Sequence, residues 1–357
     1  MNLLRNLPPL VFRHRLTEIT LFVTSSCNFK CRHCFFIDKL NERHDELSCA
    51  EIEKMGDSIG RLQRVHIGGG EPFLRPDIGD IVTAISKVWN VDTICLPTNG
   101  WATDAIVKTI RQFGSESSNS LRLHFSLNTL PEDMDDFTGK KGSFDRWIES
   151  ITRAKAAAKQ YKNITVTVLS TYNDFNQHYF PRLMDYVLNK IGVDDFSFCL
   201  VRAHHAYSPK LDLEQFERLL NDYFRNENRQ GPLLRAYREL VREVIASYYH
   251  KPRMIVPCLS GKMRVVISPE GDIYPCETLG YPSGTLPQEW CMGNIRKYNY
   301  NIRELLASEA ARKIRKNIGA RRCHCQQGID LSLNLLCSNR FKIRLLQRLG
   351  RCVLQGL

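Results

Sequence analysis

Three cysteines near the start of the chain, Cys27, Cys31 and Cys34, have the residue type and spacing of a metal-binding loop. They follow an apolar, β-branched run over residues 19–23. Cubane iron–sulfur clusters are normally held by four thiolates, so a loop that offers three leaves one iron without a protein ligand. An open metal position is where a metal centre does chemistry. The spacing indicates a catalytic metal centre; an incomplete zinc knuckle or three buried thiols is the alternative interpretation.

A glycine run followed by an acid forms a second group suited to ligand binding. Gly68, Gly69, Gly70 and Glu71 come directly after residues 65–67, which we expect to form a strand. Glycine lets the backbone approach a ligand closely and adopt a positive φ. A carboxylate accepts charge-assisted hydrogen bonds from an amine. The spacing differs from the G-x-G-x-x-G of dinucleotide-binding proteins, and a simple strand-to-helix turn is the alternative.

The cysteine loop, followed one β-α unit later by Gly-Gly-Glu, resembles the radical S-adenosylmethionine (SAM) superfamily. The resemblance implies that Cys27, Cys31 and Cys34 hold a catalytic [4Fe–4S] cluster, with the amino and carboxylate groups of SAM on the open iron. An external one-electron reductant would then allow cleavage of the sulfonium to a 5′-deoxyadenosyl radical, which removes a hydrogen atom from an organic substrate. It also implies that Gly69, Gly70 and Glu71, with Gly68 as their neighbour, hold the SAM ammonium.

Polar residues at the ends of two more predicted strands extend this set. The resemblance places Asn99, in Thr98-Asn99-Gly100, near the SAM carboxylate or ribose. It places Ser126 and Asn128 at the fourth-strand position that contacts the ribose. An Asn-Gly pair is also a common turn. Many relatives have Asp at the position of Asn128, and capping of the strand end explains that residue equally well.

The elements that must position these groups alternate between short apolar strands and longer helices. Ser48 and Glu51 form a capping box that opens one helix, and Gly114 is expected to end another. Alternation of this kind favours a parallel sheet with outer helices, with the active site at the carboxyl ends of the strands. We therefore expect an α/β fold, and the resemblance implies a partial (β/α)6 TIM-type barrel with a small C-terminal iron–sulfur auxiliary domain. The predicted strands are 17–24, 65–67, 93–96, 121–127, 164–169 and 196–201, and the predicted helices are 48–59, 77–88, 103–113, 143–159, 180–191, 213–225 and 233–250.

A second cysteine set lies in the C-terminal third of the chain. Cys258 and Cys276 are separated by x12-Gly-x4 and flank a predicted hairpin of residues 263–267 and 272–274. This pattern resembles the auxiliary-cluster domain of the SPASM and twitch branches of the superfamily. The full SPASM pattern holds seven cysteines and two clusters, whereas the smaller distal group here favours one second [4Fe–4S] cluster. The expected ligands are Cys258, Cys276, Cys323 and Cys325, with Cys337 or Cys291 as a replacement for one of them.

The metal and the role of this second site stay open at the level of sequence. Four sulfurs suit zinc as well as iron. A cluster ligated fully by thiolates would accept an electron from the substrate radical, whereas a cluster with three thiolates would leave an iron for the substrate. Arg202, His204 and His205 follow the sixth predicted strand and would either face the substrate or lie in a solvated loop.

Composition limits the compartment and the partners. The 357 residues contain thirteen cysteines, and neither a secretory signal nor an apolar run of membrane-spanning length is visible. We therefore expect a cytoplasmic protein whose thiols bind metal. The net charge of +12 is concentrated in residues 312–351, with eleven Lys and Arg against one acid. This surplus favours an anionic partner, or is a solvated basic face.

The substrate is expected to be a small organic molecule, with a phosphorylated or sugar-like compound favoured. A peptide is the alternative, and a zinc-containing nucleic-acid-binding protein is the alternative from another class; the latter leaves the agreement of the two motifs unexplained. The tail carries Phe341, Leu345 and Leu349 beside three arginines and reads as a basic amphipathic helix, on an anionic membrane or docked on the protein. The expected units are a lead-in 1–16, a core 17–205, a helical connector 206–250, an auxiliary domain 251–337 and the tail 338–357.

Overall fold

The structure is a computed structural model of the chain, and most of its residues are described. Arg202, His204, His205, Cys323 and Cys325 lie outside the described residues, so their predicted roles stay predictions. The structure describes residues 15–42, 45–193, 195–201, 210–226, individual positions between 233 and 247, and residues 253–277, 279, 286–321 and 328–354.

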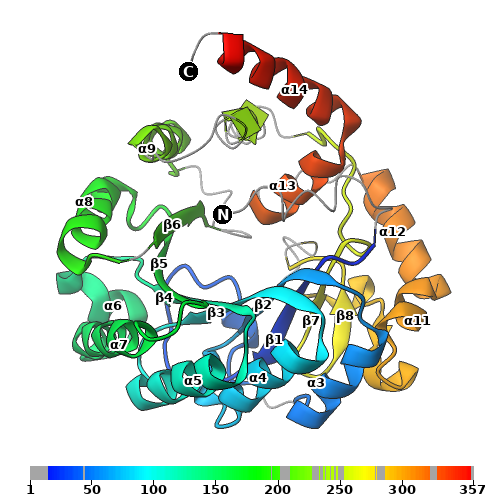
Figure 1. Ribbon diagram of the computed structural model, residues 1–357, viewed down its shortest axis with the longest axis horizontal. Helices are drawn as coiled ribbons and strands as arrows, with labels where there is room; N and C mark the ends of the chain where they lie inside the picture. The colour runs from blue at the N-terminus through cyan, green and yellow to red at the C-terminus, as the bar shows by residue number, and fades with distance from the viewer. Residues whose placement is uncertain are drawn as a thin grey trace.

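The described strands form one nine-stranded sheet in the order β6-β5-β4-β3-β2-β1-β7-β8-β9. Strands β1 to β6 are parallel to their neighbours throughout. The sheet curves, with helices on its outer side (Figure 1), and the predicted α/β partial barrel is confirmed. The six strands are β1 (Glu18–Thr24), β2 (Leu62–Gly69), β3 (Val91–Thr98), β4 (Ser120–Ser126), β5 (Ile164–Tyr172) and β6 (Asp195–Leu200).

Alternation along the strands separates an outer apolar face from an inner face. In β4, Leu121, Leu123 and Phe125 are buried and belong to the main core, which the outer helices complete. Arg122 and His124 lie between them on the opposite face, because successive side chains of a strand point to opposite sides. The helices of this layer are α3 (Cys49–Met55), α4 (Ile78–Val88), α5 (Thr103–Glu116), α7 (Ser143–Ala158) and α8 (Phe180–Asp185).

Helix ends follow the sequence signals in one case and depart from them in another. The capping box of Ser48 and Glu51 is present at the start of α3. The prediction that Gly114 ends the helix of residues 103–113 was wrong, because α5 continues to Glu116. A Cβ atom at Gly114 would lie 2.4 Å from the ring of Tyr161. The glycine is therefore explained by close packing against an aromatic ring.

The predicted C-terminal hairpin is confirmed and becomes part of the barrel wall. Strands β7 (Arg264–Ile267) and β8 (Asp272–Tyr274) are antiparallel, and Gly271 in their turn has a φ of +90°. Strand β7 also pairs in parallel with β1, which joins segments far apart in the sequence (Figure 1). Strand β9 (Gly293–Asn294) adds to β8. Helices α11 (Ile302–Ala307), α12 (Glu309–Arg321) and α13 (Gly328–Cys337) follow.

The tail forms helix α14 (Asn339–Leu354), which docks on the connector. Phe341 is buried in a small cluster with connector residues that include Leu240 and Val244. Arg344 and Arg348 form ion pairs with Glu243, at 3.0 and 2.6 Å. These contacts agree with a helix docked on the protein, and binding to a membrane stays a prediction. None of the helices in the described ranges is long and apolar enough to cross a membrane.

Candidate active site

The three cysteines of the N-terminal loop lie together beyond the carboxyl end of β1. Each thiol is half-buried, and burial raises the pKa of all three, that of Cys27 to about 11. The neighbouring thiols and Glu71 raise the pKa of Cys27 and Cys31 further. The structure therefore brings Cys27, Cys31, Cys34 and Glu71 within electrostatic reach of one another.

This donor set fits an iron–sulfur cluster. The thiolate form is the metal ligand, and iron would supply the positive charge that buried thiolates need. Among the described residues, no three His, Cys, Asp or Glu side chains converge on a single metal ion. In a cubane each thiolate binds a different iron, so the thiols need not converge on one point.

Backbone contacts hold the cysteine loop from two sides. The amide of Cys27 donates to Asn41 Oδ1 at 3.0 Å. The amides of Lys30 and Arg32 donate to the carbonyls of Thr138 and Phe137, at 2.8 and 3.2 Å. These two acceptors lie in helix α6 (Met134–Thr138). The loop is therefore braced between the segment that follows it and the connection after β4.

The glycine run is required by the contact between two backbone segments. Gly69 has a φ of +101°, and a Cβ atom there would lie 2.2 Å from the carbonyl oxygen of Thr24. A Cβ atom on Gly70 would lie 2.1 Å from the carbonyl oxygen of Ser26. The amides of Gly70 and Glu71 donate to Thr24 and Ser26, each at 2.8 Å. The turn thus fixes the residues that immediately precede the first cysteine, and its contact with SAM stays a prediction.

Glu71 joins the end of β2 to the end of β3. Its carboxylate accepts hydrogen bonds from Phe73 N (3.1 Å), Thr98 Oγ1 (2.9 Å) and Asn99 N (2.6 Å), and the residue is 2% exposed. Burial raises the pKa of Glu71 to about 7, although the three donors favour the ionised form. A carboxylate has about four lone-pair sites, so one acceptor position remains for an amine.

The remaining predicted SAM residues have different surroundings. Asn99 faces the cysteine loop, because its Nδ2 donates to Asn28 Oδ1 at 2.8 Å. Asn128 ties β4 to β5, since its Oδ1 accepts from the amide of Thr171 at 2.7 Å. Ser126 is the half-buried last residue of β4. The structure therefore places Asn99 against the cysteine loop and gives Asn128 a role in joining two strand ends.

Several residues of the site had no clear signal in the sequence. Asn28, Asn41 and Thr98 all contact predicted site residues through side-chain oxygens. Asn41 has a φ of +62°, a conformation that Asn tolerates better than most residues. An Asn or Thr in a loop is too common to be singled out without knowing its neighbours.

The inner face of the sheet is unusually polar. Interiors of complete TIM barrels are filled mainly by bulky branched side chains. Here Glu18 pairs with Arg64 at 3.3 Å, Arg122 pairs with Asp195, and burial lowers the pKa of His124 to about 4. The alternation of residues 121–127 was the signal that put Arg122 and His124 on one face, but it did not show that this face is the interior.

Cysteines of the second set lie on both sides of the C-terminal hairpin. Cys258 precedes β7 and Cys276 follows β8, and both are half-buried. Cys337, at the end of α13, donates to Met263 Sδ at 3.5 Å. Cys291 instead packs with the apolar cluster that contains Phe22 and Phe36 and that Cys34 also contacts.

Two family models match the chain. The radical SAM superfamily matches residues 21–187, and the SPASM iron–sulfur cluster-binding domain matches residues 258–327. Together they cover both cysteine sets, from the three-cysteine loop to Cys325.

Among curated proteins, the chain is similar to enzymes named GTP 3′,8-cyclase. The protein from Peptoclostridium acidaminophilum is 24% identical over 167 residues, which are 46% of this chain and 50% of that protein. The protein from Clostridium perfringens strain 13 is 29% identical over 167 residues, 45% of this chain and 50% of the relative. The chain thus spans about half the length of the curated relatives it matches.

Solved structures share the fold over most of the chain. Native anSMEcpe with bound AdoMet has a TM-score of 0.61 and 17% identity, over 94% of this chain and 98% of that one. Streptococcus suis SuiB bound to S-adenosylmethionine has a TM-score of 0.59 and 17% identity, over 87% of this chain and 70% of that one. At this identity the likeness concerns the fold alone.

Proposed function

Because the chain belongs to the radical SAM superfamily and carries an iron–sulfur cluster-binding SPASM domain, we propose that Cys27, Cys31 and Cys34 hold its catalytic [4Fe–4S] cluster. The observation that carries this assignment is the placement of three half-buried thiols beside the Gly-rich turn, at the carboxyl end of β1. When bound, the cluster supplies one electron to the sulfonium of SAM. The product radical would remove a hydrogen atom from an organic substrate.

The chain's own residues orient SAM at the carboxyl ends of the strands. The turn from Gly68 to Glu71 would offer backbone groups and one carboxylate position to the SAM amine, and its attachment to Thr24 and Ser26 keeps it beside the cysteine loop. Asn99 is held against the same loop, which supports its assignment to SAM. Ser126 and Asn128 are proposed for the ribose, with Asn128 offering its amide nitrogen because its oxygen already accepts from Thr171.

A second cluster is proposed for the cysteines around the C-terminal hairpin, with Cys258, Cys276, Cys323 and Cys325 as ligands. Helix α13 supports Cys337 over Cys291 as the replacement for one of them. The amide of Leu259, next to Cys258, donates to Asn334 Oδ1 of that helix at 2.9 Å. A fully ligated cluster here would accept an electron from the substrate radical, which gives net oxidation.

A small polar molecule, phosphorylated or sugar-like, is the substrate class we propose. The net charge of +12 supports it, because a positively charged protein attracts anionic ligands. The sequence similarity to proteins named GTP 3′,8-cyclase points in the same direction. A peptide is the second candidate, favoured by the fold shared with SuiB, which has been solved bound to its precursor peptide SuiA.

Anaerobic reconstitution with iron and sulfide tests the catalytic assignment. Two cubanes would give about eight irons per chain, and alanine at Cys27, Cys31 and Cys34 together would remove about four. The triple variant should also lose reductant-dependent formation of 5′-deoxyadenosine from SAM. Cys49→Ala is the matched control, because Cys49 is a half-buried thiol in α3 outside both sets. Cleavage of SAM by the triple variant at the parent rate would refute the assignment.

The substrate proposal has a separate test. Product analysis with phosphorylated metabolites and with short peptides, each in the presence of SAM and reductant, distinguishes the two candidates. Oxidised or rearranged metabolite supports the first, and mass loss or cross-linking in a peptide supports the second. Tight binding of zinc without SAM turnover, together with nucleic-acid binding that falls steeply with salt, would replace both by the binding-protein interpretation.

A further inference from the structure

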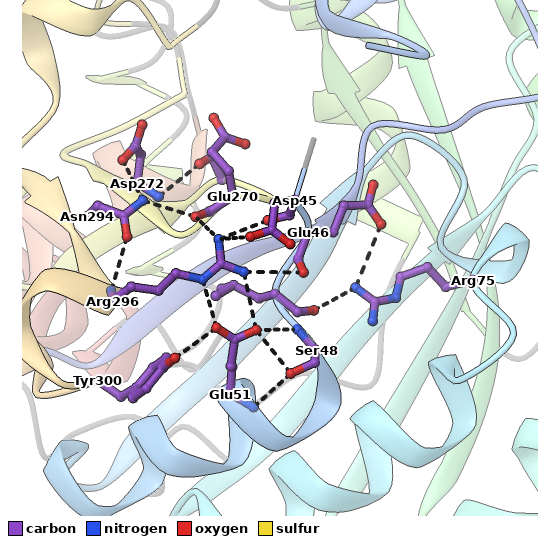
Figure 2. Close-up of polar contacts among 12 residues, drawn as sticks. Asp45, Glu46, Ser48, Glu51, Arg75, Glu270, Asp272, Asn294, Arg296 and Tyr300 are labelled. Carbon is purple, nitrogen blue, oxygen red and sulfur yellow. Dashed lines mark hydrogen bonds and ion pairs between the residues drawn. The ribbon is translucent and has the colours of Figure 1, made fainter. Parts of the chain in front are cut away.

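Arg296 connects the C-terminal auxiliary part of the chain to the segment that follows the cysteine loop. It lies in the 3-10 helix η9 (Ile295–Tyr298), directly after β9. Its Nε donates to Glu51 Oε1 at 2.7 Å and its Nη2 donates to Glu51 Oε2 at 3.2 Å. Its Nη1 donates to the backbone carbonyl of Asp45 at 2.9 Å. Figure 2 shows the guanidinium between these partners.

Glu51 is the centre of this network. Its carboxylate also accepts from the amide of Ser48 at 2.9 Å and from Tyr300 Oη at 2.8 Å. The Arg296 guanidinium holds the pKa of Glu51 well below its usual range. The side chains of Arg296 and Glu51 are only 27% and 17% exposed. The pair is bidentate and largely shielded from solvent. It therefore differs from solvated surface ion pairs, which contribute little to stability.

Arg296 is itself fixed on the auxiliary side. Its amide donates to Asn294 Oδ1 at 3.0 Å, and Asn294 Nδ2 donates to Asp272 Oδ1 at 2.8 Å and to the carbonyl of Glu270 at 3.0 Å. These acceptors belong to the turn and the second strand of the β7–β8 hairpin (Figure 2). The position of Arg296 therefore follows the position of the hairpin.

The segment held by Arg296 reaches the cysteine loop through Glu46. Glu46 Oε1 accepts from Thr24 Oγ1 at 2.7 Å and from the amide of Ser25 at 3.0 Å. Arg75 adds a second connection, because its Nη1 donates to the carbonyls of Leu47 (2.9 Å) and Val23 (2.8 Å). The segment 45–51 is thus bound to the auxiliary part at one side and to the end of β1 at the other.

We propose that Arg296 is a positioning residue for the catalytic cysteine loop, acting through residues 45–51 and Glu46 on the backbone that precedes Cys27. The docked auxiliary hairpin thereby sets the orientation of the first cysteine. The assignment of Cys27 as a cluster ligand rests on the proposed function. The series of contacts from Arg296 to Ser25 does not depend on the proposed function, since all these contacts are within the chain.

Hydrogen–deuterium exchange of the anaerobically purified holoprotein tests the connection directly. Arg296→Gln removes the charged donors, and the amides of residues 23–34 should exchange about 10-fold faster, because hydrogen bonds to charged groups are lost. Glu46→Ala should accelerate exchange in the same residues while leaving residues 294–300 unchanged. Arg61→Gln is the control, because Arg61 forms a more exposed ion pair with Asp92 elsewhere on the sheet.

The outcome pattern separates a local clamp from a positioning role. Faster exchange in residues 45–51 and 294–300 of Arg296→Gln, with residues 23–34 unchanged, would refute the proposal. If Arg296→Gln does not fold, Arg296→Lys keeps the charge but loses the bidentate contact, and a smaller acceleration in residues 23–34 is expected. No acceleration there in a folded Arg296→Lys, together with none in Glu46→Ala, would also overturn the inference.

A spectroscopic measurement extends the test to the loaded site. In Arg296→Gln, the change that SAM produces in the electron paramagnetic resonance spectrum of the reduced catalytic cluster should require about 10-fold more SAM. Iron content should stay at the parent value. If SAM does not change the electron paramagnetic resonance spectrum of the parent protein, this result counts against the proposed function. Exchange in residues 23–34 would still decide the role of Arg296, so the two failures are distinguishable.

Discussion

Replacement of Glu71 by glutamine offers a test of how the site manages a buried acid. The carboxylate is 2% exposed, and burial raises its pKa from the ordinary value of 4.5 to about 7. The folded chain therefore binds a proton at Glu71 more tightly than the unfolded chain does. The free energy of unfolding should rise as pH falls through 7 and level off below about 4.5, because protonation then favours the folded state. Glutamine cannot titrate, so the free energy of unfolding of the Glu71→Gln variant lacks this pH dependence.

The magnitude follows from the size of the pKa difference. A difference from 4.5 to about 7 corresponds to about 3 kcal/mol between the fully ionised and fully protonated limits. The steepest change is about 1.4 kcal/mol per pH unit, which is the slope for one proton. His124, whose pKa burial lowers to about 4, acts in the opposite direction as pH falls. Its contribution is common to the parent and to Glu71→Gln, so it cancels in their difference.

Urea unfolding of the metal-free chain at several pH values provides the assay. The difference in unfolding free energy, parent minus Glu71→Gln, should grow by about 3 kcal/mol between pH 8 and pH 4.5. Infrared difference spectra should show a protonated carboxyl band that titrates near pH 7 in the parent and is missing in the variant. A difference that stays flat over this range, or that shrinks as pH falls, would show that the three donors outweigh burial and keep Glu71 ionised.

Two further predictions concern the glycine turn and the tail. The Gly70→Ala variant should lose most of the proposed catalytic cluster, because the alanine Cβ atom would lie 2.1 Å from the Ser26 carbonyl oxygen. The measurement is the iron content, which should fall by about four per chain. Gly319→Ala is the control, because no atom lies within 4 Å of a Cβ atom there. Deletion of residues 340–357 should abolish any binding to anionic liposomes and expose the connector residues that Phe341 covers. Sedimentation with liposomes measures the binding, and unchanged binding of the truncated chain would refute the membrane hypothesis.

The strand ends of the core could be predicted because local signals agree there. Residues 121–127 alternate strictly, and the short apolar run before the cysteine loop ends in polar residues. In a parallel sheet all carboxyl ends meet at one edge, so Cys27, Glu71 and Asn99 were expected to gather. The structure confirms that they lie near one another, through the contacts of Glu71 with Asn99 and its electrostatic effect on Cys27.

Contacts between distant segments could not be predicted from the sequence. The parallel pairing of Glu18 with Arg264 joins residues on the two sides of the whole core, and no local pattern specifies such a partner. Arg296 likewise had no signal, because its partner Glu51 was already explained by the capping box with Ser48. The Glu51 carboxylate contacts both Ser48 and Arg296, and a sequence pattern reveals only the contact with the nearby Ser48.

The position of β7 bears on how the two cysteine sets are related. Strand β7 occupies the edge of β1, so the auxiliary hairpin covers backbone groups that would otherwise be exposed at the strand preceding the catalytic loop. Arg264 strengthens this union, because its Nη2 donates to Thr20 Oγ1 of β1 and to Glu277 Oε1, both at 2.9 Å, while buried. Glu277 directly follows Cys276. A buried pair that loses one partner is costly, so the loop that carries Cys276 and the strand that leads to Cys27 are held in one arrangement. The hairpin between Cys258 and Cys276 is therefore built on the barrel wall, and its position relative to the cysteine loop is set by the register of β1 and β7.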